Sequence, residues 1–514
     1  MEITSILLLC LILFSFSALI QLSRGKQSRK LKNLQPPGPP GWPILGNFFD
    51  LGAAPHQTLH KLKPKYGPVL GLKLGSVNTV VIQSAMAASE FFKKHDHDFC
   101  NRKCPTVLTA HNFYQGTIAF GRYGKHWRMR RRICSTELLM NRQTNEAARL
   151  RRKCIDDMIR YIEEDAAAAQ ERGEEGKVNL ARLLFLMSFN LVGNLVLSRD
   201  LLNSGSKDGK EFFDAMNDVM VWAGKPNLAD FLPVSKWLDP QGIKRNMVRD
   251  MGRALEIVSN FVKERVDELK LAEEQETKDL LDALLEHTGE GKQGPDSISN
   301  QIVVVIILEM FFAGSETRSS TIEWAMAELL RKPGSMKKVK EEINRVTGPQ
   351  RKVEESDIDN LPYLQAVVKE TLRLHPVVPL LLPRNAMQDT DYMGYFIPKE
   401  TQIFVNVWAI GRDPETWEDP LAFKPERFLG SKIDYKGQNF ELLPFGSGRR
   451  ICLGISLAHK VVHLGLATLL HSFDWELGNN ICPETIDMNE RVGITTRKLI
   501  PLEAIPKKRV MDAR

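Results

Sequence analysis

Cysteine is scarce in this chain of 514 residues, which contains seven, an odd number. Their spacing is not that of a disulfide framework, so the sequence indicates a chain that folds in a reducing compartment. Cys100 and Cys104 could ligate a metal, but no second pair of Cys or His stands at zinc-site spacing. The cysteines lie at positions 10, 100, 104, 134, 154, 452 and 482.

Neither sign of charge dominates, because 70 Lys and Arg stand against 63 Asp and Glu, a net charge of +7. Basic residues gather after the N-terminal apolar run, at 122–132 and at the C-terminus. This distribution favours a membrane surface and an acidic protein partner over nucleic acid, for which no motif is present. The length allows about three domains, yet no interior linker divides the chain.

Nucleotide-binding and hydrolase motifs are also missing. The glycine-rich residues 446–451 do not form Gly-x-Gly-x-x-Gly, because Ile451 stands where the third glycine belongs, and they do not form Gly-x-Ser-x-Gly. The chain therefore has no nicotinamide or flavin motif of its own.

A long uncharged apolar run lies at the N-terminus. Residues 3–23 carry no charge and are long enough to span a bilayer, and five basic residues follow within 24–32. The positive flank predicts an uncleaved anchor with the rest of the chain in the cytosol. The alternative, a cleaved signal peptide, would have a basic start and a shorter apolar core. The proline-rich residues 36–43 predict a stiff spacer.

One cysteine, Cys452, stands in a glycine-rich stretch just before an apolar run with helical character. A thiolate there would lie at the start of a helix, where the macrodipole favours the ionised form. The glycines let a flat ligand approach closely, and Arg450 can pair with an anionic group beside it. These features are what haem ligation through cysteine requires. The cysteine and glycines alone are equally compatible with a small buried side chain in an ordinary turn.

The full pattern at residues 445–454, Phe-x-x-Gly-x-Arg-x-Cys-x-Gly, resembles the haem-binding loop of the cytochrome P450 family at every fixed position. The resemblance implies haem b as the cofactor and Cys452 as the axial ligand of its iron. It also implies that Arg450, Phe445 and Gly446 contact the cofactor.

Trp127 and Arg131 lie four residues apart in a basic stretch, so they share one face of a helix. A charge run alone is typical of a solvated surface. In the cytochrome P450 family this Trp-x-x-x-Arg pair contacts a haem propionate, so the resemblance implies that role here and a similar one for Arg384. It further implies that the remaining basic residues dock an NADPH–cytochrome P450 reductase, which would supply the electrons.

Residues 302–312 are apolar almost all round and predict a buried helix that begins after Asp296 or Ser297 and ends near residue 330. The sequence Ala-Gly-Ser-Glu-Thr at 313–317 places a carboxylate and an alcohol inside it, which is costly unless they function. The stretch resembles the oxygen-activation motif of cytochromes P450, which implies that Glu316 and Thr317 are catalytic and guide protons. Arg318 departs from the family pattern, where Thr or Ser is usual, and would have to reach a water or a carboxylate.

Glu370 and Arg373 are three apart on a predicted helix, a spacing typical of surface pairs. Together with Arg427 in Pro-Glu-Arg-Phe they resemble the family's Glu–Arg–Arg cluster. The resemblance implies a structural role, in which the cluster holds the scaffold of the haem loop.

The patterns elsewhere predict strands at 69–74, 79–82 and 401–406, a hairpin tip at 492–496, a long loop at 100–121 and mostly amphipathic helices over 145–285. With the resemblance, we expect a mainly α protein with a small β-rich lobe, the cytochrome P450 fold and one N-terminal transmembrane helix. The expected extents are an anchor at 1–23, a hinge at 24–43 and a catalytic domain at 44–514.

The substrate pocket is expected to draw on dispersed segments. The sequence of residues 226–242 resembles that of the plant cytochromes P450 that oxidise geraniol, iridoids and related terpenoids. The candidate pocket residues are Thr109, His111, Phe113, Ile118, Ala313, Val377, Val378, Leu382 and Ile494.

The resemblance covers the whole chain and implies a plant microsomal monooxygenase of the endoplasmic reticulum. It would insert one oxygen atom of O2 into a C–H bond of a small apolar terpenoid, or of a phenolic or fatty acid. Three alternatives remain open at this point. They are a lyase or isomerase that needs no O2, a haem carrier or sensor, and a thiol enzyme that uses Cys452 with His459 as its base.

Overall fold

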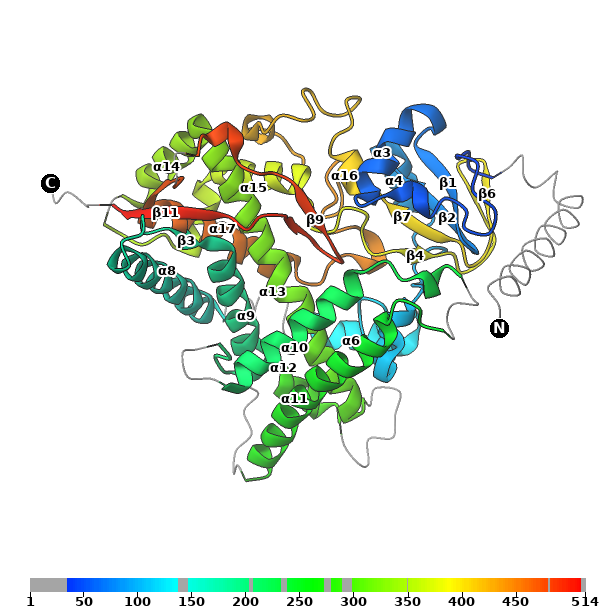
Figure 1. The fold of residues 1–514 in the computed structure, drawn as a ribbon, viewed down its shortest axis with the longest axis horizontal. Coiled ribbons are helices and arrows are strands. Elements are labelled where there is room, and N and C mark those ends of the chain that lie inside the picture. The colour runs from blue at the N-terminus through cyan, green and yellow to red at the C-terminus, as the bar shows by residue number, and fades with distance from the viewer. Residues whose placement is uncertain are drawn as a thin grey trace, which may run out of the picture. The chain divides into compact units, whose positions relative to one another are not determined.

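The computed structural model describes residues 35–136, 147–202, 207–232, 238–271, 279–288, 298–348, 350–478 and 481–509 (Figure 1). The predicted membrane anchor lies outside these residues. The chain divides into two compact units. The first comprises Met1–Lys103, Asn227–Gln241 and Leu380–Ile410, and the second comprises Cys104–Pro226, Gly242–Pro379 and Gly411–Arg514.

The first unit is built on a four-stranded sheet of order β1-β2-β7-β4, in which β2 and β7 are parallel and the other pairs antiparallel. Strand β2 is rich in β-branched residues, which pack well on a pleated surface. The predicted strands at 69–74, 79–82 and 401–406 are confirmed. The elements are η1 (Phe49–Leu51), α3 (Pro55–Tyr66), β1 (Val69–Leu74), β2 (Val77–Ile82), α4 (Ala85–Lys94), η4 (Leu228–Asp230), β4 (Arg384–Asn385), β5 (Thr390–Tyr392), β6 (Tyr395–Ile397), β7 (Gln402–Val405) and α16 (Val407–Ile410).

The described part of the proline-rich stretch lies along this sheet. The N–H of Gly71 in β1 donates to the carbonyl of Pro37 at 2.8 Å, and the Asn47 side chain reaches the carbonyl of Pro39 at 3.4 Å. Gly71 has no room for a Cβ, because one would lie 2.4 Å from the carbonyl oxygen of Pro36. The spacer is therefore fixed to the β-rich unit from residue 36 onward.

The second unit is mainly helical and also contains two small sheets, of order β3-β11-β8 and β10-β9. Its helices are η2 (Thr106–Asn112), α5 (Phe113–Gly116), α6 (Lys125–Cys134), α8 (Ala148–Glu171), α9 (Leu180–Leu197), α10 (Lys207–Gly224), α11 (Ile243–Leu271), α12 (Leu280–Glu286), α13 (Asn300–Arg331), α14 (Pro333–Thr347), η6 (Glu355–Asn360), α15 (Pro362–Leu374), η7 (Pro425–Phe428), η8 (Gly448–Arg450), α17 (Ile455–Ser472) and η9 (Pro483–Thr485). Its strands are β3 (Val178–Asn179), β8 (Phe473–Glu476), β9 (Glu490–Val492), β10 (Thr496–Lys498) and β11 (Glu503–Lys508).

Helix α13 runs through the middle of this unit with α9 beside it (Figure 1). Its apolar first half is buried, as predicted, and Phe311 packs against Phe189 of α9 and Phe212 of α10, with ring centroids 5.1 and 4.9 Å apart. The helix begins later than predicted. Its N-cap is Ser299, whose hydroxyl accepts the N–H of Ile302 at 3.4 Å, and the predicted cap positions 296 and 297 lie outside the described residues.

Two other predictions differ from the structure. Residues 106–116 form the short helices η2 and α5 rather than an unbroken loop. Helix α9 is buried nearly all round rather than amphipathic, because it lies inside the core against α13 and α8. Within the described ranges it is also the one helix long and apolar enough to cross a membrane, yet 78% of it is buried in the protein.

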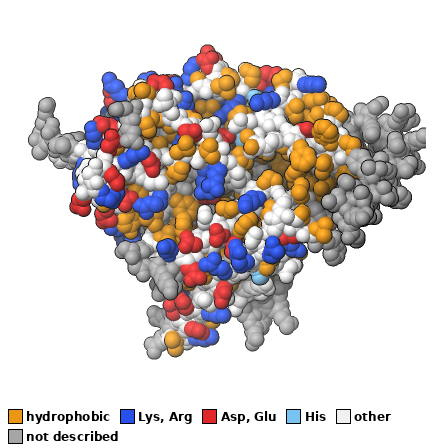
Figure 2. Space-filling model, in the orientation of Figure 1, with side chains coloured by type: hydrophobic (Ala, Val, Ile, Leu, Met, Phe, Trp, Pro, Cys, Tyr) orange, Lys and Arg blue, Asp and Glu red, His pale blue; other side chains and the backbone are white. Residues whose placement is uncertain are grey.

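Helices α10 and α11 carry both signs of charge on the surface. Figure 2 shows acidic and basic side chains interspersed over them, and pairs such as Arg253–Glu211, at 3.7 Å, join the two helices. This surface therefore presents no extended field of one sign.

Candidate functional site

The loop that holds Cys452 turns at two glycines. Gly446 and Gly448 have φ values of 70° and 69°, which glycine adopts without strain. The N–H of Cys452 donates to the carbonyl of Phe445 at 3.0 Å and closes the loop. Helix α17 begins three residues after the cysteine, with Gly454 as its N-cap. The sulfur therefore lies near the N-terminus of this helix.

The Cys452 thiol is both reachable and desolvated. Its residue is exposed, yet burial by surrounding protein raises the pKa of the thiol. The backbone N–H of Gly454 and the charges of Arg131 and Arg318 lower this pKa and only partly oppose the effect of burial. The protein around the loop therefore shields the thiol in part, although the residue is accessible. A thiol of this kind loses its proton when a metal binds, which fits an iron ligand.

Within the part of the chain that the structure describes, no group of three or more His, Cys, Asp or Glu side chains could hold a metal ion. A thiolate that binds the metal of a prosthetic group needs no further ligand from the protein.

Two guanidinium groups and one indole ring lie close together beside the loop. The guanidinium of Arg450 lies 4.0 Å from the ring centroid of Trp127, and that of Arg131 lies 5.5 Å from it. Arg131 Nη2 donates to the carbonyl of Ile451 at 2.7 Å. Helix α6 therefore holds the residue next to the cysteine and brings two cations and an indole together, a set suited to carboxylates.

Helix α13 is mostly buried, but one position near its middle is exposed. Ala313 is exposed although Phe311 and Ser315 beside it are buried, so the helix borders a reachable space at this turn. Thr317, one turn later, donates its hydroxyl to the carbonyl of Ala313 at 2.8 Å. Glu316 is buried and forms an ion pair with Arg497 of β10, with Oε1 and Nε 2.5 Å apart.

Among the described residues, Arg318 contacts backbone carbonyls and no carboxylate. It is buried, and its Nε donates to the carbonyl of Gly314 at 2.6 Å while Nη2 lies 3.4 Å from the carbonyl of Ser188 on α9. Its Nη1 has no hydrogen-bond partner among the described residues. Burial lowers the pKa of Arg318 to about 10, so it stays charged at neutral pH. The departure from the family pattern thus adds a buried positive charge near Cys452.

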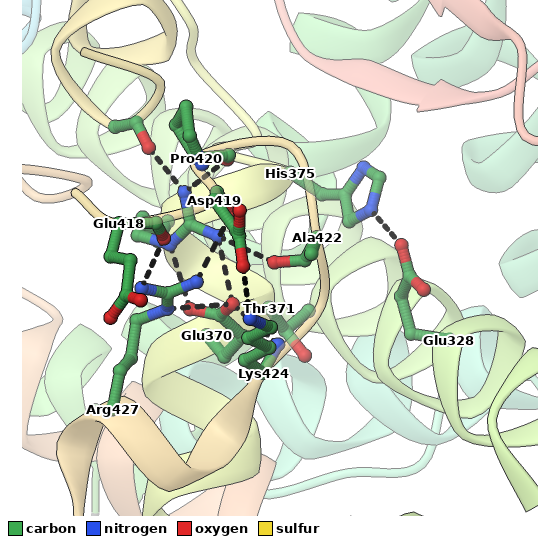
Figure 3. A network of polar contacts seen from close by, with 12 residues as sticks. Glu328, Glu370, Thr371, His375, Glu418, Asp419, Pro420, Ala422, Lys424 and Arg427 are labelled. Carbon is green, nitrogen blue, oxygen red and sulfur yellow. Dashed lines mark hydrogen bonds and ion pairs between the residues drawn. The ribbon is translucent and has the colours of Figure 1, made fainter. Parts of the chain in front are cut away.

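Glu370, Arg373 and Arg427 form a buried network, drawn in Figure 3. Both nitrogens Nε and Nη2 of Arg373 contact the Glu370 carboxylate at 2.7 Å, and Arg427 Nε lies 3.1 Å from it. The N–H of Lys424 also donates to Glu370, at 2.7 Å. Arg373 further donates to the backbone carbonyls of Gly411, Pro420 and Ala422. The network therefore joins α15 to the segment at 411–427.

The predicted pocket residues fall into several environments. Thr109 and His111 are exposed, and the ring of His111 contacts the carbonyl of Val248 on α11 at 2.8 Å. Phe113 meets Phe312 edge to face, with centroids 6.1 Å apart. Of the remaining candidates in this unit, Ile118 and Val377 are buried, Val378 and Ile494 are half-buried and Ala313 is exposed.

Two predicted residues lie in the first unit. Arg384 is buried in an ion pair with Asp96, at 2.7 Å, and its guanidinium lies over the ring of Phe92. Leu382 is half-buried, and its carbonyl accepts a hydrogen bond from Arg102. Their proposed contacts with cofactor and substrate stay predictions.

Two features of this unit were not predicted from the sequence. A small cavity lies between α9, α10 and α13, and is lined by Phe185, Met216, Asn217, Met220, Phe311, Phe312, Ser315, Glu316 and Arg497. Glu309 is buried in the apolar half of α13, and both of its carboxyl oxygens accept backbone N–H groups. A single acid within an apolar run would have been the only sequence signal.

The thiol-enzyme alternative needs a base beside Cys452. His459 instead contacts the hydroxyl of Tyr435, with 2.5 Å between Nδ1 and the oxygen. Burial lowers the pKa of His459. Within the described ranges no hydrogen bond joins this imidazole to Cys452, so no Cys–His pair forms.

Comparison with known proteins shows the family of this chain. The family profile described as cytochrome P450 matches residues 36–502. The chain therefore belongs to the cytochrome P450 family and is a monooxygenase of that family, which implies a haem iron. The predicted cytochrome P450 fold, mainly α with a small β-rich lobe, is confirmed as well, and the N-terminal transmembrane helix stays a prediction.

Individual relatives show which members of the cytochrome P450 family this chain is similar to. An iridoid oxidase of Catharanthus roseus is 59% identical over 503 residues, which are 98% of this chain and 96% of that protein. Geraniol 8-hydroxylase of the same plant is 41% identical over 479 residues, covering 93% and 95%. A zebrafish cytochrome P450 solved with abiraterone matches with a TM-score of 0.73 at 27% identity, over 89% of this chain and 100% of that one. The predicted resemblance to plant terpenoid hydroxylases is confirmed.

The buried network predicts a large loss of stability on removing its carboxylate. Glu370→Ala leaves Arg373, which is fully buried, without a counter-charge, and we expect a loss of about 3–5 kcal/mol. The measurement is the denaturant concentration at which the helical circular dichroism signal is half lost.

The matched control is Glu341→Ala, which removes an exposed ion pair with Lys337, 3.8 Å long, and should cost about 0.5 kcal/mol or less. Equal midpoints for the two variants would contradict a structural role for the network.

Proposed function

We propose that the chain is a haem-thiolate monooxygenase that inserts one oxygen atom of O2 into a C–H bond of a small apolar terpenoid. The electrons would come from NADPH through a reductase. The observation that carries the proposal is the Cys452 thiol, which is desolvated yet reachable and lies in a loop held by α6. The names of the relatives, an iridoid oxidase and a geraniol 8-hydroxylase, support a terpenoid substrate.

Residues of the cysteine loop and of α6 would hold haem b. Cys452 would ligate its iron, and the N–H of Gly454 would stabilise the thiolate. Arg131 and Arg450 would bind the haem carboxylates, and Trp127, which packs against both guanidinium groups, would hold them in place. Phe445 and Gly446 would give the loop its close approach. Haem bound in this way supplies the redox chemistry that activates O2.

Proton delivery would rest on Glu316 and Thr317. The Thr317 hydroxyl lies one turn from the exposed Ala313, so a rotation would turn it from that carbonyl toward the reachable space. Glu316 is held by its ion pair with Arg497, and it would have to release this partner to carry a proton. This ion pair would therefore keep Glu316 out of proton transfer until it opens.

Substrate choice would rest on shape. The candidate lining is mostly apolar, with Phe113, Ile118, Val377, Val378 and Ile494 in the second unit. An apolar wall offers no charged anchor, so it would select by the proximity of one C–H bond to the oxygen-binding position. A small terpenoid matches such a wall better than an acid does.

The same proposal includes the extents and the location of the chain. Residues 1–23 would anchor it in the membrane of the endoplasmic reticulum, residues 24–43 would be the hinge, and 44–514 would form the cytosolic catalytic domain. The apolar run with its basic flank supports this arrangement.

Helix α6 would also dock the reductase. Arg122, Lys125, Arg128 and Arg132 are exposed on or beside this helix, whereas Arg130 is buried. The exposed set would attract an acidic surface, and α6 also contacts the cysteine loop through Arg131. Electrons would therefore arrive close to the haem.

The oxygen source tests the reaction. The full chain, reconstituted with a plant NADPH–cytochrome P450 reductase, NADPH and geraniol or an iridoid alcohol under 18O2, should give a product that carries one heavy oxygen atom. Mass spectrometry of the product reads the label, because a monooxygenase incorporates one atom of O2.

Product formed under argon, or product without label, would contradict the monooxygenase proposal and favour a lyase or isomerase. Labelled product from a phenolic or fatty acid but from no terpenoid would overturn the substrate class alone.

Charge reversal on α6 tests the partner. Arg128→Glu should raise the reductase concentration needed for half-maximal electron transfer by about tenfold at low salt, and the difference should shrink at high salt because exposed charges are screened. Stopped-flow haem reduction at two ionic strengths provides the measurement. Lys337→Glu on α14, also exposed, serves as the control and should leave the value unchanged. Equal effects of the two reversals would show that α6 is not the docking surface.

A further inference from the structure

Glu309 is a buried acid on α13 that the proposed reaction does not use. Its side chain is 6% exposed. Its two carboxyl oxygens accept the N–H groups of two consecutive residues, Oε2 from Ile118 at 2.6 Å and Oε1 from Ala119 at 2.8 Å. One carboxyl group thus holds two peptide groups of the segment that joins α5 to α6.

The other side of the same segment is held by two side chains assigned to the haem site. The carbonyl of Ile118 accepts from Trp127 Nε1 at 2.8 Å and from Arg450 Nη1 at 3.1 Å. Arg450 Nη2 also donates to the carbonyl of Gly121 at 2.7 Å. Ile118 is therefore the point at which Glu309 meets the tryptophan and the arginine.

We propose that Glu309 is a positioning residue for the cofactor site. Its carboxyl group fixes residues 117–121, and through the Ile118 carbonyl this segment sets the positions of the Trp127 ring and the Arg450 guanidinium group. The inference rests on the proposed haem function and extends it to a residue one turn before Ala313. Glu309 touches neither the reacting atoms nor Cys452.

The charges around Glu309 determine how the contact responds to pH. Arg130 and Cys134 face it from α6, and Arg450 faces it from η8. Burial raises the pKa of Glu309 to about 7, and the two N–H donors and the two guanidinium groups oppose this rise.

The direction of the pH dependence follows from the linkage between proton binding by Glu309 and closure of the segment. The raised pKa means that the closed arrangement binds a proton more tightly than an opened one in which the carboxyl group meets water. The segment is therefore held most firmly below the ordinary pKa of 4.5, and less firmly as the pH rises through about 7.

The test compares Glu309→Ala with a variant that loses the same kind of contact elsewhere. Glu342 on α14 is 7% exposed and accepts the N–H groups of Tyr363 and Leu364, both at 2.9 Å. Glu342→Ala therefore removes an equally buried carboxyl group with two consecutive backbone donors, away from α6. Glu309→Gln is added as a variant that keeps the shape without the titration.

The first readout is amide hydrogen exchange of the peptide that spans 117–121. Each lost hydrogen bond is worth a factor of about five, and this substitution removes two. Glu309→Ala should therefore speed exchange there by at least about tenfold, and Glu342→Ala should leave it unchanged. Unchanged exchange in Glu309→Ala would overturn the proposal at its first step.

The second readout is the rate at which the holoenzyme loses haem to an apo-globin, followed by absorbance. Glu309→Ala should lose haem about tenfold faster than both the wild type and Glu342→Ala. Wild-type loss should speed up as the pH rises through 7, and Glu309→Gln should lack this step. Faster exchange without faster haem loss would overturn the positioning role.

Failure of the proposed function gives a different result. A wild-type chain that takes up no haem overturns the haem site and the positioning role together, whereas normal haem uptake with equal loss rates overturns the positioning role alone.

Discussion

The arrangement depends on one constraint, which is that the Cys452 thiol must be shielded by protein and still stay accessible to a ligand. Burial alone would make it an inert core thiol, and exposure alone would leave it to oxidise. The structure meets both demands by turning the loop at Gly446 and Gly448 and holding its end with Arg131, while the N–H of Gly454 reaches the sulfur. The buried Glu370 network joins α15 to the segment at 411–427 in the same unit.

Helix α13 combines several tasks along one buried length. Glu309 holds the segment before α6, the face with Ala313 and Thr317 borders the reachable space, and Arg318 places a positive charge near the thiol. A buried polar group is tolerated only when it is satisfied, and these side chains are satisfied mainly by backbone groups. Polar function in this core therefore depends on the exact course of neighbouring segments rather than on side-chain pairs.

Much of the site could be predicted from the sequence where the chemistry fixes residue types at short spacing. The cysteine loop, Trp127 with Arg131, and Glu370 with Arg373 are of this kind, and the structure brings the first two sets together at Ile451. Glu309 escaped prediction because its partners are N–H groups that every residue has, 190 and 191 positions away. Arg318 was expected to reach a carboxylate or a water. It instead donates to the carbonyl of Gly314, one turn back on its own helix, and lies 3.4 Å from the carbonyl of Ser188, which depends on how α9 packs and is encoded by no spacing.

The central claim is that Cys452 ligates a haem iron, and the carbon monoxide difference spectrum of the dithionite-reduced protein tests it most directly. The wild type and Cys482→Ser, which changes another exposed cysteine, should show the strongly red-shifted Soret band of thiolate-ligated haem. Cys452→Ser should lack this band. Absence of haem from the wild type, or a band at the shorter wavelength of histidine ligation, would contradict the account.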